Sequence, residues 1–227
     1  PQPLSQDTIA AISIAVDANF ERQIAFLQEI VRAPSLRGKE AAVQRTVAEA
    51  LAARGYEVES YPIDVSALSR HPAWSPATID YRDTFNVSGR KRPSASSGRS
   101  LILNAHVDVV PTANPDAWSH PPFAAVRQGD WLFGRGAGDM KAGLAANLFA
   151  VDAIEAAGFE LTAPLELQSV VDEESMREAD MSSSVTGALS EVSGPDRRAS
   201  ISATSFSETP SASEIWRYTM LCAGVAP

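Results

Sequence analysis

The stretch LILNAHVDVVP, residues 101–111, decides the fold of this chain. Its first part, Leu101 to Leu103, is a short continuous apolar run, which is typical of a strand buried on both faces of a sheet. Residues two apart in an extended chain point the same way, so His106 and Asp108 should project together beyond the strand's carboxyl end, where α/β sheets place their chemistry. An imidazole beside a carboxylate suits a metal ligand that a neighbouring acid orients. Taken alone, such a pair more often has a purely structural role. Whether it binds a metal here depends on the motifs further along the chain.

Composition indicates a globular protein with an acidic surface. The chain has 227 residues, 44% of them hydrophobic and 21% charged, enough for one ordinary domain or a domain with an appendage. The net charge of −9 argues against nucleic acid as a partner. No apolar stretch is as long as a membrane span and no secretory signal is visible, so we expect no membrane association. The single cysteine, Cys222, excludes an internal disulfide and favours the cytoplasm.

Helical and strand patterns alternate up to about residue 171. Apolar steps of three or four predict helices over residues 7–33, 40–54 and 140–157, with Ser5 or Asp7 as the first cap. Strand patterns cover residues 56–63, 101–105, 124–128, 131–133 and 164–171, with a weaker one at 85–87. Residues 89–98 are rich in turn formers and predict a surface hairpin loop. The order of elements predicts an α/β sandwich rather than a helix bundle.

The segment GRGAGDMKAG, residues 134–143, opens the last predicted helix. Its glycines superficially suggest a phosphate-binding loop, but it lacks both the GxGxxG order and the GKS or GKT ending of nucleotide-binding motifs. Close backbone packing beside a site carried by Asp139 is the better explanation of the glycines. A simple helix cap at Asp139 remains an alternative.

Glu173 and Glu174 directly follow the apolar strand 164–171. A solvated acidic loop would explain them, yet two adjacent carboxylates repel, and a nearby cation relieves that repulsion. Neighbouring side chains in an extended chain point apart, which predicts different tasks for the two glutamates. The three sites that bear His or acids all lie at strand ends or helix starts, so we expect them to meet at one edge of the sheet.

HVDVVP, GRGAGDMKAG and VVDEES, in this order, resemble the motifs of the M20 metallopeptidase family. The spacings are 33 residues from His106 to Asp139 and 34 from Asp139 to Glu173. The resemblance is greatest to the branch of acetylornithine deacetylases and succinyl-diaminopimelate desuccinylases, and it covers residues from about 18 to 175. The fold that it implies is a three-layer αβα sandwich with a mostly parallel central sheet, a zinc-peptidase-like catalytic domain that is incomplete here.

The resemblance implies a metal-dependent hydrolase of amide C–N bonds that removes the acyl group of an N-acyl amino acid or a peptide-like substrate. Two divalent ions, zinc or cobalt, would act as Lewis acids at the amide. His106 would bind one metal, Asp139 would bridge both, and Glu174 would bind the second. Asp108 would orient the His106 ring without binding the metal itself, and Glu173 would be the general base. The mixed imidazole and carboxylate donors suit zinc.

Two basic residues near the motifs, Arg135 and Lys141, are candidates for binding a substrate carboxylate. Arg135 is the better candidate, although a structural or surface role is the more common one for such residues. His120 is expected to be a surface imidazole, and Trp118 is expected to pack rather than to recognise a ligand.

The resemblance ends after Ser175, which divides the chain into residues 1–175 and an atypical tail, residues 176–227. The tail has eleven serines in 52 residues and no clear periodicity, so we expect aberrant or poorly ordered sequence there. The lid and dimerisation domain and the late histidine ligand of the family are absent from it. We therefore expect metal binding to be weaker than in a complete enzyme. A catalytically dead fragment that acts, if at all, as a binding module is the alternative to an active hydrolase.

Overall fold

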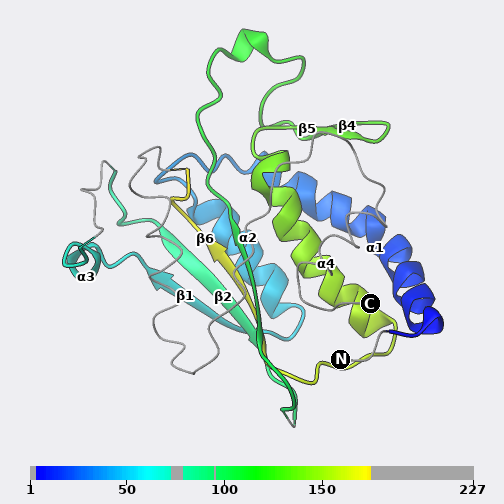
Figure 1. Ribbon diagram of the computed structural model, residues 1–227. Helices are drawn as coiled ribbons and strands as arrows, with labels where there is room; N and C mark the ends of the chain where they lie inside the picture. The colour runs from blue at the N-terminus through cyan, green and yellow to red at the C-terminus, as the bar shows by residue number, and fades with distance from the viewer. Residues whose placement is uncertain (1–3, 73–78, 95, 175–227) are drawn as a thin grey trace.

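The structure, a computed structural model, describes residues 4–72, 79–94 and 96–174. The predicted tail, residues 176–227, lies outside the described residues. The elements are α1 (Gln6–Arg32), α2 (Ala41–Ala52), β1 (Glu57–Pro62), α3 (Val65–Leu68), β2 (Phe85–Lys91), β3 (Leu101–His106), η1 (Pro115–Ala117), β4 (Val126–Gln128), β5 (Trp131–Phe133), η2 (Ala137–Lys141), α4 (Ala142–Ala156) and β6 (Leu165–Val170) (Figure 1). Apart from the short α3, η1 and η2, which were not predicted, they follow the predicted order of helices and strands.

The central sheet is mixed, with the strand order β1-β2-β6-β3. β1 pairs with β2 and β2 with β6 in antiparallel fashion, whereas β3 and β6 are parallel. This confirms the α/β class, but among the described residues the prediction of a mostly parallel sheet is wrong. Neighbouring parallel strands need a long crossover, usually a helix. α4 supplies it between β3 and β6, whereas only the single turn α3 lies between β1 and β2.

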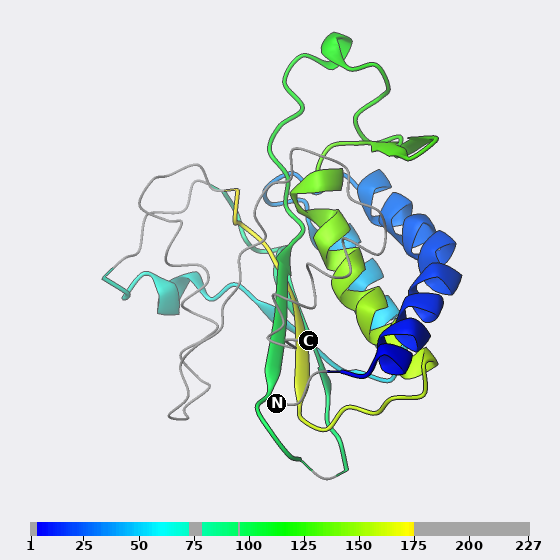
Figure 2. The same ribbon diagram turned by 45° about the vertical axis from the view of Figure 1, so that its right-hand side comes forward.

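The three long helices cover one face of the sheet. Figure 2 shows α1, α2 and α4 together on one side, with the short α3 on the other. The second helical layer of the predicted three-layer sandwich is therefore not seen in the described part of the chain. The core lies between the helices and the sheet, and its buried side chains include Leu27, Ile30 and Val31 of α1, Val43, Val47 and Leu51 of α2, Leu144 and Leu148 of α4, and Val87, Ala105 and Leu167 of the sheet. Each large apolar side chain buried here stabilises the fold by about 1.5–3 kcal/mol.

Helix boundaries follow their capping residues. The Ser5 side chain accepts a hydrogen bond from the Thr8 N–H, so Ser5 rather than Asp7 caps α1. Gly55, at φ +75°, takes the left-handed conformation that directs the chain from α2 into β1. None of the helices in the described part of the chain combines the length and the apolarity needed to span a bilayer.

β2 is longer than its sequence pattern indicated. Residues 89–91, predicted as part of a loop, form the end of this strand inside the sheet. Gly89 is required there because a Cβ atom would lie 3.0 Å from the Leu51 side chain of the overlying helix α2. Arg90 is held on the other face by Glu166 of β6, at 2.8 Å. Both contacts are tertiary, so turn-forming composition misled the local prediction.

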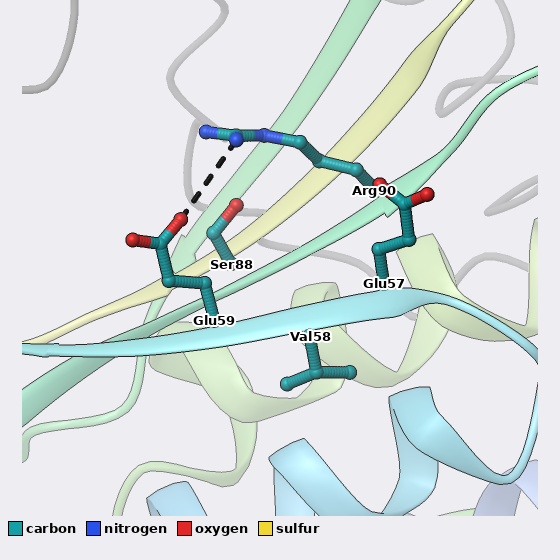
Figure 3. Close-up of a pocket in the computed structure, with 5 residues that line it drawn as sticks. All are labelled: Glu57, Val58, Glu59, Ser88 and Arg90. Carbon is teal, nitrogen blue, oxygen red and sulfur yellow. Dashed lines mark ion pairs between the residues drawn. The ribbon is translucent and has the colours of Figure 1, made fainter.

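The sheet face away from the long helices is polar. Glu166 accepts hydrogen bonds from Ser88 and Arg90, and Arg90 also pairs with Glu59 at 3.8 Å (Figure 3). Near the β1 edge a hollow of about 110 Å³ is lined by Glu57, Val58, Glu59, Ser88 and Arg90. This hollow lies at the opposite edge of the sheet from β3, which ends in His106.

Candidate metal centre

Three chain segments meet at the carboxyl ends of β3 and β6. His106 is the last residue of β3 and lies opposite Val170, the last residue of its parallel neighbour β6. Glu173 and Glu174 follow β6 within four residues, and Asp139 belongs to η2, just before α4. Because the two strands are parallel and adjacent, segments separated by more than thirty residues along the chain emerge at the same edge.

The imidazole of His106 is the centre of this cluster. Its Nε2 atom lies 3.2 Å from Oδ1 of Asp139 and 3.6 Å from Oε2 of Glu173. His106, Glu173 and Glu174 each offer one ligand atom, and these three atoms lie within 4.8 Å of one another. The imidazole is 4% exposed, whereas the side chains of Asp139 and Glu173 are 82% and 44% exposed. A cation could therefore reach the buried nitrogen through the solvent-facing carboxylates.

The other ring nitrogen of His106 is held by Asp108. Nδ1 lies 3.1 Å from the Asp108 backbone carbonyl oxygen and 3.4 Å from Oδ1 of the same residue. Oδ2 of Asp108 accepts the backbone N–H of Glu174 at 2.8 Å. Asp108 is fully buried, and within the described part of the chain its Oδ1 has no hydrogen-bond partner of good geometry. With Nδ1–H donating to Asp108, loss of the Nε2 proton would present a lone pair to the carboxylate cluster, the arrangement that a metal-binding histidine requires.

The charges around His106 favour a positive charge at this point. Burial by itself lowers the pKa of the imidazole, but the hydrogen bond and charge of Asp108, the charge of Glu173 and the contact with Asp139 together raise it to about 9. The pKa of Glu174 is raised by burial and by the charges of Asp139, Glu173 and Asp108, against the opposing effect of His106. A cation among these carboxylates would relieve their repulsion.

The donor set fits a divalent metal ion. One imidazole nitrogen and up to three carboxylates converge, and zinc and cobalt accept such mixed nitrogen and oxygen ligands. The buried Asp108 contacts Nδ1 of the imidazole, the ring nitrogen that faces away from the cluster, as the partners of metal-binding histidines commonly do. The residues present therefore fit the group that the sequence motifs imply.

The glycine-rich segment packs closely against its surroundings, as predicted. A Cβ atom on Gly136 would lie 2.3 Å from Cγ1 of Val109, and one on Gly134 would lie 2.5 Å from Cγ1 of Val31. Gly136, at φ +75°, also precedes η2 as its cap residue. Asp139 has non-helical angles within η2, and its side chain contacts His106, which disfavours the alternative of a simple helix cap.

The two basic candidates have different surroundings. Lys141 is completely buried, and its Nζ donates to the backbone carbonyls of Ile30 and Ala33 at the end of α1, at 2.7 and 3.1 Å. Its role is structural, in agreement with the common role of such residues. The guanidinium of Arg135 lies 5.0 Å from the ring centre of Trp118, and its buried Nε has no hydrogen-bond partner among the described residues. Binding of a substrate carboxylate by Arg135 stays a prediction.

Sequence reasoning missed the connection between α1 and α2, which it treated only as a helix stop and a loop. Ser35 donates to the Val107 carbonyl at 2.6 Å and accepts the Val109 N–H at 3.0 Å, so this connection lies directly beside the Asp108 segment. Arg37 pairs with Asp172, the residue before Glu173, at 2.7 Å. The only local signal was the presence of polar residues directly after a helix that ends at proline.

The comparison with protein families is consistent with this geometry. The model of "Peptidase family M20/M25/M40" matches residues 102–212, a span that includes His106, Asp139, Glu173 and Glu174 and continues past Ser175.

Two curated relatives match over part of the chain. The N-formyl-4-amino-5-aminomethyl-2-methylpyrimidine deformylase of Bacillus subtilis is 43% identical over 102 residues, which are 43% of this chain and 24% of the relative. The succinyl-diaminopimelate desuccinylase of a Methylobacterium species is 37% identical over 123 residues, 54% of this chain and 27% of the relative. The chain thus spans about a quarter of the length of these relatives.

Among solved structures, the di-peptidase Dug1p of Saccharomyces cerevisiae is similar to this fold. The TM-score is 0.60 at 20% sequence identity, over 74% of this chain and 35% of the yeast protein. At this identity the likeness establishes the fold and carries no statement about substrates.

Proposed function

We propose that the chain is a member of the M20 peptidase family and forms the metal-binding part of an amidohydrolase. This enzyme would remove the acyl group of an N-acyl amino acid or a related amide. The observation that carries this proposal is the convergence of His106, Glu173 and Glu174 within 4.8 Å, with Asp139 at 3.2 Å from the same imidazole. The names of the two relatives, a deformylase and a desuccinylase, both describe the removal of an acyl group, which supports this substrate class.

His106, Asp139 and Glu174 would hold the metal ions, two zinc or two cobalt ions by analogy with the family motifs. When bound, such ions polarise the amide carbonyl and make water a stronger nucleophile near neutral pH. The backbone carbonyl oxygen of Asp108 lies 3.1 Å from Nδ1 of His106 and orients the ring, and Oδ2 of its side chain accepts the backbone N–H of Glu174. One buried residue therefore aligns two proposed ligands, one at the end of β3 and one shortly after β6.

Glu173 is the proposed general base. Its carboxylate is exposed at the cluster, and one of its oxygens lies 3.6 Å from Nε2 of His106. There it can accept a proton from the attacking water and later deliver that proton to the nitrogen of the leaving amine. Arg135, whose Nε lacks a hydrogen-bond partner in the part of the chain that the structure describes, is the proposed ligand of the substrate carboxylate. The single cysteine of the chain supports a reducing compartment, such as the cytoplasm, as its setting.

Metal titration with a hydrolysis assay tests the proposal. We expect purified protein to bind zinc or cobalt and to hydrolyse N-acetylornithine or related amides when the metal is added. His106→Gln should weaken metal binding by about 100-fold or more because it removes the one nitrogen donor that the described residues bring to the cluster. His120→Gln is the matched control, since His120 packs against Phe133 instead.

The outcomes separate the two candidate functions. Metal binding that His106→Gln abolishes, together with turnover, supports the hydrolase. Metal binding without turnover of any acylated amine would favour the alternative, a binding module derived from a hydrolase. Equal metal affinity in the parent and in His106→Gln would contradict both.

The pH dependence of metal binding follows from the raised pKa of His106. A metal needs the neutral imidazole, so at pH 7 binding should release about one proton from His106. The affinity should rise by about tenfold per pH unit from pH 7 and level off near pH 9. Calorimetric titration in two buffers with different ionisation enthalpies measures the released proton. No proton release at pH 7 would mean that the carboxylates do not hold His106 in its charged form.

The stability of the metal-free protein should fall as the pH rises, whereas its metal affinity should increase. A folded-state pKa above the unfolded value of 6.5 means that the stabilisation by charged His106 is fully present below pH 6.5. It is lost as the pH rises through about 9. Thermal denaturation of the metal-free protein across this range should show a decline that His106→Gln reduces.

A further inference from the structure

Asp172, the residue before the two glutamates, is held by side chains from two distant loops. Nε and Nη2 of Arg37, in the α1–α2 connection, both lie 2.7 Å from Oδ1 of Asp172. The hydroxyl of Tyr81, in the segment before β2, donates to Oδ2. Arg37, Tyr81 and Asp172 are called the Asp172 clamp below. Both carboxylate oxygens of Asp172 are engaged within the protein, which separates this acid from the carboxylates around His106.

Asp172 adopts a backbone conformation that aspartate rarely takes. Its φ of +69° lies in the left-handed region, which disfavours residues with a Cβ atom. β6 ends at Val170, so this is the point where the extended chain turns toward the cluster. The direction in which Glu173 and Glu174 leave the strand therefore depends on this one residue. Asn86 of β2 stabilises the same turn by accepting the Val171 N–H at 3.0 Å.

The loops that carry the clamp are themselves fixed. Glu40 is completely buried and accepts hydrogen bonds from the Gly38 N–H at 2.8 Å and from Thr84 Oγ1 at 3.2 Å. It thereby joins the loop of Arg37 to that of Tyr81. A charge-assisted contact made from a rigid frame positions its partner more accurately than one made from a free loop.

From these contacts we infer that Arg37 and Tyr81 are positioning residues for the metal centre: they hold Asp172 in its left-handed turn and so direct Glu173 and Glu174 toward His106. The inference rests on the proposed function, because it gives the clamp a task only if the cluster binds metal. It assigns a role to three residues that do not touch the cluster themselves.

Asp172→Gly is the decisive variant. Glycine accepts φ +69° without strain, so the turn remains available and the urea denaturation midpoint should stay close to that of the parent. The bonds from Arg37 and Tyr81 are lost, however, and the glutamates are no longer held in one direction. We expect the affinity for cobalt(II), measured per folded molecule by its visible absorption band, to fall by about 10–100-fold.

Two milder variants and a control accompany it. Tyr81→Phe removes one hydrogen bond while preserving the ring, and Asp172→Asn preserves the size and the tolerance of positive φ but not the charge. Both should weaken cobalt binding less than Asp172→Gly does. Arg82→Gln is the matched control, because Arg82 lies next to Tyr81 but pairs with the exposed Asp80. It should leave cobalt binding unchanged.

The results separate the clamp from the proposed function. If the parent protein binds no cobalt, the proposed function fails and this inference fails with it. If the parent binds cobalt and Asp172→Gly binds it equally well per folded molecule, only the clamp is overturned. A fall in stability with unchanged affinity per folded molecule would show a merely structural role and would also overturn the inference. Weakened binding with the denaturation midpoint retained supports it.

Discussion

Glu173→Gln is expected to lower turnover of an acylated amine by about 10²–10⁴-fold while changing cobalt affinity by less than about threefold. Glutamine has nearly the same shape but cannot accept a proton at this oxygen, so the general base is lost without a large change in packing. The measurement is kcat for the metal-loaded protein, together with a cobalt titration of the same sample. The effect should appear in kcat rather than in KM, since proton transfer belongs to the transition state.

Glu174→Gln is the matched comparison for this prediction. Glu174 is the proposed metal ligand, and its backbone N–H is bound by the buried Asp108. This variant should lose metal affinity first, by about 10–100-fold, and lose turnover as a consequence. A loss of metal affinity in Glu173→Gln as large as in Glu174→Gln would contradict the division of roles, because it would make Glu173 a ligand as well.

Gly136→Ala is expected to lower the free energy of unfolding by about 2–4 kcal/mol. The added Cβ atom would lie 2.3 Å from Cγ1 of Val109, which is 1% exposed and cannot move freely. The substitution also places a side chain at φ +75°, where only glycine is unstrained. Urea denaturation of the metal-free protein measures the change.

Gly138→Ala in the same segment is the control for Gly136→Ala. A Cβ atom there would meet no described residue within 4 Å, and the φ of Gly138 is not in the left-handed region, so a change below about 0.5 kcal/mol is expected. Equal effects of the two substitutions would mean that the segment can shift away from Val109. The packing account of these glycines would then be wrong.

Periodicity and turn residues were sufficient to predict most of the described elements. α1 and α2 follow their apolar steps, and Ser5 and Gly55 are read directly as the cap of one helix and the end of the other. His106, Asp139, Glu173 and Glu174 were predicted to meet because each lies at the end of a strand or the start of a helix. The structure brings them together, whereas their separate roles as ligand, bridge and base remain predictions.

The sheet pattern could not be predicted in the same way. β2 contains Gly89 and is followed by turn-forming residues, so its own composition indicates a loop. Its place between β1 and β6 depends on the fit of Gly89 against Leu51 and on the pairing of Arg90 with Glu166, which lies 76 residues further along the chain. The antiparallel pairing of this strand is also a property of the assembled sheet.

The sequence by itself determined the helices, the buried strand that carries His106 and the set of residues able to bind a metal, because these depend on the spacing and chemical type of nearby residues. Only the tertiary structure decided the mixed sheet, the burial of Lys141 against the end of α1 and the contact of Arg37 with Asp172 across 135 residues. The physical reason is that a buried polar group must find a partner, and which partner it finds depends on which segments the packed core brings side by side.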